Sequence, residues 1–209
     1  MLLALILAAA GGPQVPVFSD PRLAEALGRF DPRPGAWVEY AVLPKGGPQI
    51  RLRLSVLGPA LPDGRYWLEV ATQAQGTPPV AMKMLLHGAP GRAENIERLY
   101  LYLGGQAPLQ LPVADAHAAA APPKSAPPKV ERKGTQELKL GAGAFRCEVL
   151  QVQDTRIFRS DKVPLWGLVR AQDPRQRVEL IGYADSGAET VFPPGFDNAD
   201  QGNGRDRTK

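Results

Sequence analysis

The sequence predicts a mainly β (α+β) protein: an antiparallel, strongly curved sheet or unclosed barrel of about nine to eleven strands with a short N-terminal helix. Three observations favour this fold. Glycine and proline each occur 22 times among 209 residues, which suits short strands joined by turns better than a helical bundle. From residue 37 onward apolar and polar residues alternate, with the period of a strand. A flat sheet of this size would leave long exposed edges, so a curved one is expected.

The first ten residues are apolar and end in small residues, before Gly11-Gly12-Pro13 breaks any helix that they form. This pattern is typical of a secretory signal peptide and its cleavage site. Because a bilayer-spanning helix needs about 20 apolar residues, residues 1–10 are too short for a permanent anchor. We therefore expect an exported protein, periplasmic or extracellular, that is not an integral membrane protein. An N-terminal strand or buried helix is the alternative, since no basic residue precedes Arg22.

One short amphipathic helix is predicted ahead of the strands. A helix-start signal at residues 19–21 precedes Leu23, Leu27 and Phe30, which recur at helical spacing over residues 22–30. The strands predicted from alternation and turn residues follow at 37–42, 50–56, 66–72, 80–86, 96–103, 137–140, 145–153, 155–159, 164–171 and 177–184.

A single domain over residues 11–192 accounts for this pattern. Residues 104–134 are expected to form an exposed loop rich in proline and alanine, because this composition offers too little apolar area to offset the cost of ordering the backbone. A linker between two domains is the alternative, although the strand pattern resumes unchanged after it. Residues 193–209, rich in glycine, asparagine, aspartate and arginine, predict a disordered tail.

No catalytic or metal-binding pattern stands out in the sequence. Two histidines and one cysteine are too few for a zinc site of nitrogen and sulfur ligands, and no G-x-S-x-G elbow is present. Glu39 and Glu69 lie in the middle of predicted strands, where an isolated glutamate is normally solvated. The net charge of +4 is spread over mixed charges, without the basic and aromatic stripe of a nucleic-acid-binding protein. We therefore expect no enzyme activity, metal, cofactor or nucleic-acid partner, and a buried, apolar role for Cys147.

The apolar positions of the predicted strands are the remaining candidate site. They would line one concave face, and those assigned to ligand lining are Leu52, Leu54, Val56, Leu68, Val70, Met82, Met84, Leu86, Phe145, Val149 and Leu180. Barrels of this size either fill their interior with side chains or enclose one ligand. Methionines such as Met82 and Met84 would give an acyl chain an adaptable lining. An ordinary filled core is the alternative.

The order of these parts resembles the periplasmic lipoprotein-carrier (LolA/LolB-like) superfamily. The export signal, the short first helix, the antiparallel strand series and the mid-chain segment carry the resemblance over residues 20–192. Residues 160–170 are also similar to a V-P-x-x-G-L/V-V segment of uncharacterised exported relatives. The resemblance implies an unclosed barrel with an apolar cavity for lipid acyl chains. The residues expected to cover its mouth are Leu23, Leu27, Phe30, Leu165 and Trp166.

Two functions follow as hypotheses. The first is a non-enzymatic exported envelope protein that binds a lipid or a lipidated partner in a concave apolar face. The second is a protein-interaction or scaffold β domain with a filled core, which binds an envelope protein through a strand edge. An empty apolar pocket would favour the first hypothesis, and a packed interior the second.

Overall fold

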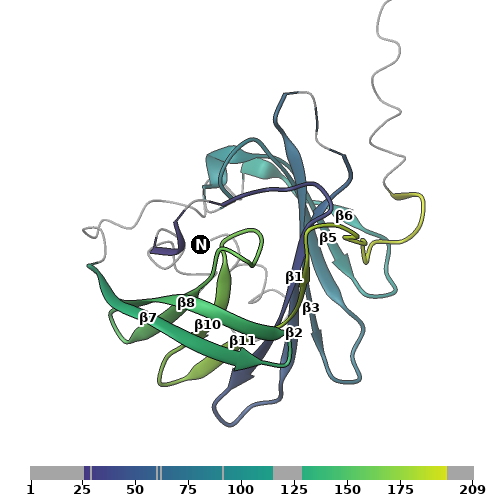
Figure 1. Ribbon diagram of the computed structural model, residues 1–209. Helices are drawn as coiled ribbons and strands as arrows, with labels where there is room; N and C mark the ends of the chain where they lie inside the picture. Colours follow the sequence, from purple (N-terminus) through teal and green to yellow (C-terminus); the bar gives the residue numbers. More distant parts are fainter. Residues whose placement is uncertain are drawn as a thin grey trace, which may run out of the picture.

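The computed structural model describes residues 26–28, 30–59, 61, 63–90, 92–114 and 129–196. Over these residues, eleven strands form one antiparallel sheet (Figure 1). The strands are β1 (Trp37–Pro44), β2 (Ile50–Leu57), β3 (Tyr66–Ala74), β4 (Val80–Leu86), β5 (Ile96–Leu103), β6 (Leu109–Gln110), β7 (Val130–Leu140), β8 (Gly143–Val152), β9 (Thr155–Arg159), β10 (Leu168–Gln172) and β11 (Gln176–Ala184). A short 3-10 helix, η1 (Ala93–Asn95), precedes β5. The predicted mainly β class and curved, unclosed sheet are confirmed.

The strand order is that of an up-and-down barrel opened at one place. Across the sheet it runs β6-β5-β4-β3-β2-β1-β11-β10-β9-β8-β7. Every strand except β6 and β7 has its neighbours in the chain as its neighbours in the sheet, with β11 pairing back onto β1. The ring is interrupted between β6 and β7, which are consecutive in the chain but form the two edges. Figure 1 shows the bend of the sheet, with β7, β8, β10 and β11 to one side of the wall that contains β1, β2, β3 and β5.

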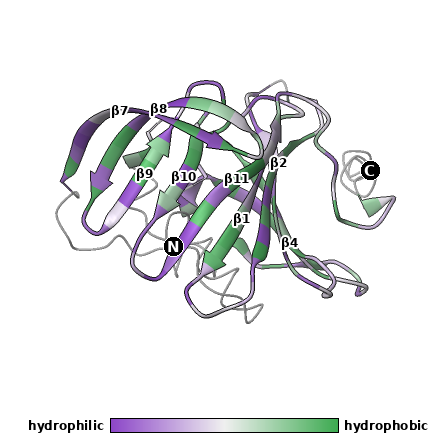
Figure 2. Cartoon of the chain, turned by 60° about the horizontal axis from the view of Figure 1, so that its bottom comes forward, coloured by the Kyte–Doolittle hydropathy of each residue, from purple (hydrophilic) through white to green (hydrophobic). Residues whose placement is uncertain are grey.

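Strand β2 shows why the alternating pattern produces this sheet. Its aliphatic residues Ile50, Leu52, Leu54 and Val56 are buried, whereas Arg51 between them keeps 64% of its side chain exposed. Successive side chains of a strand point to opposite faces, so this alternation places one apolar side against the core. Figure 2 shows the same alternation as green and purple bands along the strands.

One side of the sheet is apolar over most of its width, and we call it the core face. Each of the strands β1 to β5 contributes one residue to a row of successive pairs, namely Val38, Leu54, Val70, Met82 and Leu101. Directly paired residues point to the same side of the sheet. A parallel row continues the core face to β8, and its members are Ile50, Val42, Val178, Ala171, Ile157 and Leu150. The hydrophobic core therefore lies against this side of the sheet.

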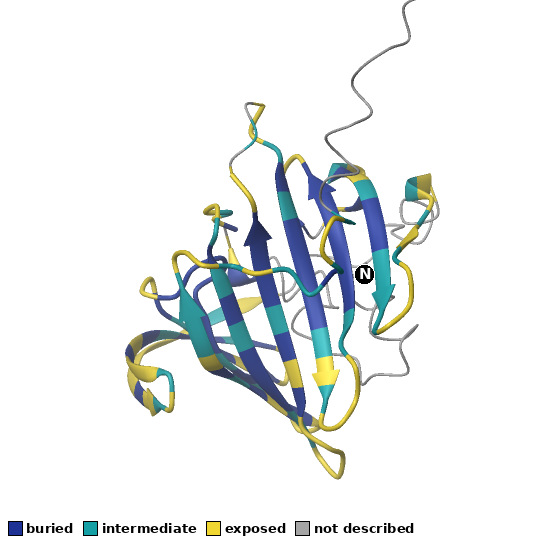
Figure 3. Cartoon of the chain, turned by 90° about the vertical axis from the view of Figure 1, so that its right-hand side faces the viewer, coloured by how far each residue is buried: buried dark blue, intermediate teal, exposed yellow. Residues whose placement is uncertain are grey.

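The chain after β11, residues 185–196, forms a strap across the opposite face (Figure 3). The Phe192 ring lies 5.5 Å from the Tyr102 ring and 5.0 Å from the Phe196 ring. The Phe196 ring meets Tyr100 edge-on at 5.0 Å. These aromatic contacts form a second, smaller apolar cluster. The strap thus includes residues 193–196, which follow the predicted end of the domain at residue 192.

Glu69 lies beneath the strap, so the expectation that it is solvated is wrong. Its carboxylate accepts hydrogen bonds from the Thr190 hydroxyl (2.5 Å) and the Val191 N–H (3.0 Å). The directly paired Lys83 is also buried, with its ammonium 4.9 Å from the centre of the Trp67 ring. Burial raises the pKa of the Glu69 carboxyl, against the opposing effects of these hydrogen bonds and of Lys83. The carboxylate binds the strap to the sheet.

Strand β7 starts earlier than predicted. The sequence predicts only residues 137–140 as strand and residues 104–134 as loop, whereas β7 begins at Val130 and β6 also falls within 104–134. Because β7 is an edge strand, polar residues such as the successive Glu131 and Arg132 occupy both of its sides, and the alternation that marks a half-buried strand is missing. Residues 115–128 of the predicted loop lie outside the described residues.

The predicted strand at residues 164–171 is wrong in its first half. β10 begins at Leu168, and residues 160–167 form a turn in which the Ser160 N–H donates to the Gly167 carbonyl at 2.8 Å. Of the predicted helix, the described part shows helical geometry at Ala26 and Leu27. The predicted signal peptide, residues 1–10, lies outside the described residues.

Candidate functional site

The predicted ligand-lining residues are all buried, and all belong to one apolar cluster. None of them is more than 5% exposed. Strands β2, β3 and β4 supply most of them through every second residue, so that Leu54, Val70 and Met82 lie side by side. Leu180 of β11 joins this surface because it pairs with Tyr40, which pairs with Leu52. The core face is therefore continuous through these residues.

Phe145 and Val149 join the cluster from β8, outside the paired rows that define the core face. Val149 is paired with Phe158, which is paired with Arg170. This row lies on the side of the sheet opposite to Leu150, the β8 residue that takes part in the core face. Phe145, four residues before Val149 on the same strand, shares its side. Both side chains nevertheless belong to the same apolar cluster, and the Phe145 ring lies 5.8 Å from that of Tyr183, which is paired with Val38 of the core face.

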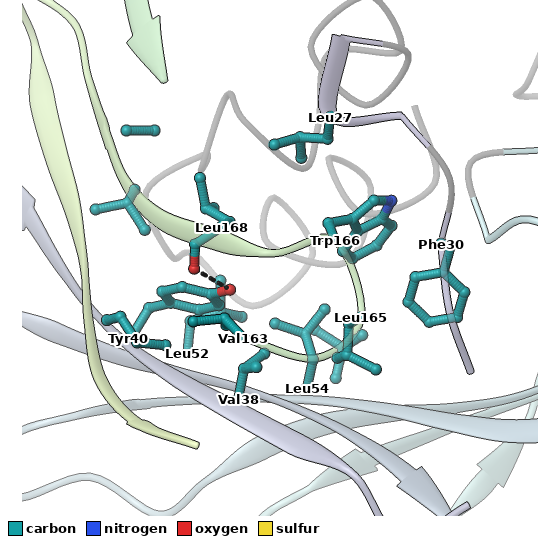
Figure 4. Close-up of a cluster of buried hydrophobic side chains, with 14 of the residues drawn as sticks. Leu27, Phe30, Val38, Tyr40, Leu52, Leu54, Val163, Leu165, Trp166 and Leu168 are labelled. Atoms are coloured by element: carbon teal, nitrogen blue, oxygen red, sulfur yellow. Dashed lines mark hydrogen bonds between the residues drawn. The ribbon is translucent and has the colours of Figure 1, made fainter. Parts of the chain in front are cut away.

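A two-part cover lies over the core face. It consists of residues 26–28, 30 and 31, and of the turn at residues 160–167. Four of the predicted mouth residues are described and buried, and Figure 4 shows them above the sheet residues Val38, Leu52 and Leu54: Leu27, Phe30, Leu165 and Trp166. The fifth, Leu23, lies outside the described residues. The structure thus brings both predicted groups, lining and mouth, into one cluster.

Ring contacts join the two parts of the cover to each other and to the sheet. The Phe30 ring centre lies 4.6 Å from that of Trp166 and 5.7 Å from that of Tyr66. In the described part of the chain, one main-chain hydrogen bond links the two parts, from the Asp31 N–H to the Leu165 carbonyl at 3.0 Å. Side-chain packing, rather than a ladder of main-chain bonds, therefore holds the cover in place.

The turn of the cover carries backbone strain. Leu165 has a φ of 66°, in the left-handed region that costs a residue other than glycine about 1–2 kcal/mol. Gly167 has a φ of 72°, and a Cβ there would lie 2.9 Å from the Ser160 carbonyl oxygen. Beyond the turn, the buried Tyr40 hydroxyl donates to the Leu168 carbonyl at 3.1 Å (Figure 4). The turn is thus strained at Leu165 and fixed where β10 begins.

Tyr40, Tyr66 and Val163 belong to this cluster but were not predicted as site residues. For Tyr40 a signal existed, because it alternates with Val38 and Val42 in a predicted strand. For Val163 the signal was weaker: the residue immediately precedes the segment 164–171 that the sequence predicts as strand. Its place under the cover depends on the turn that replaces that strand.

Neither Glu39 nor Glu69 points into the core face. Glu39 lies on the opposite face, with its carboxylate 3.7 Å from the Arg51 guanidinium. Glu69, also on that face, binds the strap. Among the described residues, no group of three or more histidine, cysteine, aspartate or glutamate side chains could hold a metal ion. Cys147 is buried as predicted, and burial raises the pKa of its thiol.

The β7 edge is poorly suited to pairing with another chain. Its register shifts between Arg132 and Thr135, which marks a bulge, and bulges twist an edge away from a partner strand. Glu131 accepts from the Lys133 ammonium at 2.7 Å, and both side chains are about half exposed. Charges and bulges are the features by which natural sheets protect their edges.

The comparisons with known proteins are limited to weak structural likeness. No family model and no curated protein matches the sequence. The solved structures found include MucB in complex with MucA(peri), at 13% identity and a TM-score of 0.45, covering 86% of this chain and 59% of MucB. A second is a protein described as a lipoprotein from Parabacteroides distasonis, at 12% identity and a TM-score of 0.37, covering 74% of this chain and 97% of that one. A third is a protein described as exported, with a YmcC-like fold, from Bacteroides fragilis. It has 14% identity and a TM-score of 0.33, and the match covers 74% of this chain and 98% of that one.

These values carry no conclusion about function. This chain spans only 59% of MucB, and all three TM-scores lie below 0.5. The resemblance to the lipoprotein-carrier superfamily stays a prediction. In the part of the chain that the structure describes, no helix has the length and apolar character to cross a membrane.

Proposed function

We propose that this chain is a non-enzymatic, exported envelope protein that binds the acyl chain of a lipid or lipidated partner against its core face. The observation that supports the proposal is that, within the described residues, a single main-chain hydrogen bond joins the two parts of the cover. Large apolar side chains, among them Leu27, Phe30 and Trp166, lie over a continuous apolar surface. An acyl chain would take the place of these side chains.

Burial energies set the size of the ligand. Returning four large side chains to water costs about 1.5–3 kcal/mol each, or roughly 6–12 kcal/mol in all. Each acyl CH₂ that leaves water returns about 0.8 kcal/mol, so roughly 8–15 methylenes are needed to balance the opening. Long-chain acyl groups therefore fit, whereas short ones do not. Met82 and Met84 on the core face suit such a ligand, because their flexible side chains adapt to different chain shapes.

An interaction or scaffold domain with a filled core is the second candidate function. The near-complete burial of the core-face residues under the cover favours it. In that case the cover is a permanent part of the core, and an envelope protein would bind elsewhere on the surface. The two functions differ in one property, which is whether the cover opens.

Native mass spectrometry of the protein purified from the periplasm, followed by lipid extraction, tests the proposal. A bound lipid, together with uptake of a fluorescent C16 fatty acid but not of a C8 analogue, would support it. Trp166→Ala should speed uptake by loosening the cover, whereas the matched control Trp67→Ala on the opposite face should not. A folded protein that is empty and takes up neither fatty acid would refute it and favour the filled core.

Export is tested on the same sample. The proposal predicts that the mature protein lacks residues 1–10 when its mass is measured. A full-length protein retained in the cytoplasm would contradict the assignment of residues 1–10 as a signal peptide.

A further inference from the structure

Arg159 lies where the sheet meets both parts of the cover. It is a half-buried residue at the end of β9, directly before the turn at residues 160–167. It is paired with Leu168 of the apolar cluster, so its side chain leaves the sheet on the side of that residue. Its guanidinium reaches Gly28 in the other part of the cover, where a Cβ would lie 3.3 Å from Nη1. A positive charge is therefore held at the border of the cover.

Within the described chain, this guanidinium has no counter-charge. Its Nε is buried and makes no hydrogen bond, and no described carboxylate lies within ion-pair distance of it. The carboxylate of Glu148, the residue paired with Arg159 on β8, lies instead 3.3 Å from the Nε of Arg132. Asp31 of the cover accepts from the Nε of Arg33 at 2.7 Å. Both of these acidic groups are thus neutralised by other arginines.

Other arginines with a buried, unbonded Nε differ from Arg159. Arg65 and Arg170 each bind a carboxylate through a terminal nitrogen, at 2.8 and 2.6 Å. Arg53 lies over the Trp37 ring at 4.3 Å. Among the described residues, Arg159 has neither kind of partner. Removing a cation partly from water without a counter-charge is unfavourable, so a bound anion would explain why an arginine stands at the border of the cover.

We propose that Arg159 binds the negatively charged head group of the acyl ligand, an inference that rests on the proposed function. An acyl chain that enters the core face displaces residues 26–28. This movement takes Gly28 away from the guanidinium and exposes its donors, Nε included, to the ligand. The planar fork of an arginine matches the oxygens of a carboxylate or of a phosphate. The ligand is then a fatty acid or an acidic phospholipid rather than a neutral acyl ester.

Direct titration of the full chain with the fluorescent C16 fatty acid and with its methyl ester tests this inference. The ester removes the negative charge that the carboxyl group carries near pH 7. The acid should bind about tenfold more tightly than the ester, as expected for one charge-assisted hydrogen bond. Competition then separates the sources of the anion. Stronger displacement by hexadecanoate identifies a fatty acid, and stronger displacement by hexadecyl phosphate identifies a phospholipid head group.

Arg159→Met should abolish the preference for the acid, by weakening the acid about tenfold and leaving the ester unchanged. Arg159→Lys, which keeps the charge, should retain part of the preference. Methionine keeps an unbranched stem and removes the unbonded donors, so Arg159→Met should resist urea at least as well as the parent protein. The matched control Arg146→Met removes the same charge from an exposed position of β8 and should leave both affinities unchanged.

The possible failures of this inference and of the proposed function differ. Equal binding of acid and ester by the parent protein would overturn the inference alone, since both probes would still occupy the core face. Equal weakening of both probes by Arg159→Met would overturn it as well, because the arginine would then only hold the cover. Loss of the preference in Arg146→Met would reveal a general effect of net charge and contradict the inference. If neither probe binds, the proposed function fails, and the inference fails with it.

Discussion

Leu165 in the cover is subject to two opposed energies, which substitution by alanine and by glycine separates. Its side chain is buried, so truncation to alanine is expected to cost about 2–5 kcal/mol. Its φ of 66° costs about 1–2 kcal/mol in any residue with a Cβ, and only glycine removes that cost. Glycine in turn loses about 0.4–1 kcal/mol through the greater freedom of the unfolded chain. Leu165→Gly should therefore be more stable than Leu165→Ala by about 0.5–1 kcal/mol.

Urea unfolding at equal m values measures this difference as a shift of the midpoint. Leu168 is the matched control, because it is fully buried, lies in β10 and is not among the residues with positive φ. At Leu168 the usual order should hold, with glycine less stable than alanine by about 0.5–1 kcal/mol. If alanine is the more stable substitution at Leu165 as well, the turn is not strained and this account of the cover is wrong.

Three further predictions concern the sheet and its two faces. The pKa of Glu69 is raised in the folded state, so the protonated carboxyl stabilises the fold at low pH, and this stabilisation is lost as pH rises through that pKa. The parent protein should therefore lose more free energy of unfolding between about pH 4 and pH 8 than Glu69→Gln does. Urea titrations at each pH would measure the difference. Gly167→Ala should destabilise by more than about 2 kcal/mol in the same assay, because its Cβ would meet the Ser160 carbonyl at 2.9 Å at a left-handed φ. Tyr40→Phe should cost about 1–2 kcal/mol, seen as a lower melting temperature, because it leaves the buried Leu168 carbonyl without its hydroxyl donor.

The strands that the sequence predicts well are those with one buried side. The predicted ranges 80–86, 96–103 and 155–159 coincide with β4, β5 and β9, because burial of alternate residues imposes a period of two on the sequence. Strand β7 lacks this period, since an edge strand exposes both sides. Its first residues were therefore assigned to a loop.

The candidate site was predictable as a set of apolar residues but not as an arrangement. Alternation identified Leu54, Val70 and Met82 as inward-facing, and pairing then placed them side by side. The side on which Val149 lies depends on the register of β8 against β9 and β10, which no local pattern reveals. The left-handed conformation of Leu165 likewise depends on tertiary packing, since leucine rarely adopts it alone.

Locking the cover tests the central claim most directly. Asp31 and Leu165 form an antiparallel bridge, so their Cα atoms lie within the range that a disulfide can span, and the buried Cys147 is not expected to compete. In the double variant Asp31→Cys/Leu165→Cys, uptake of a fluorescent C16 fatty acid should be lost on oxidation and restored on reduction, while Leu165→Cys alone should be insensitive to redox state. Equal uptake by the oxidised and reduced forms, or no uptake by either, would contradict an acyl-binding core face that opens through its cover.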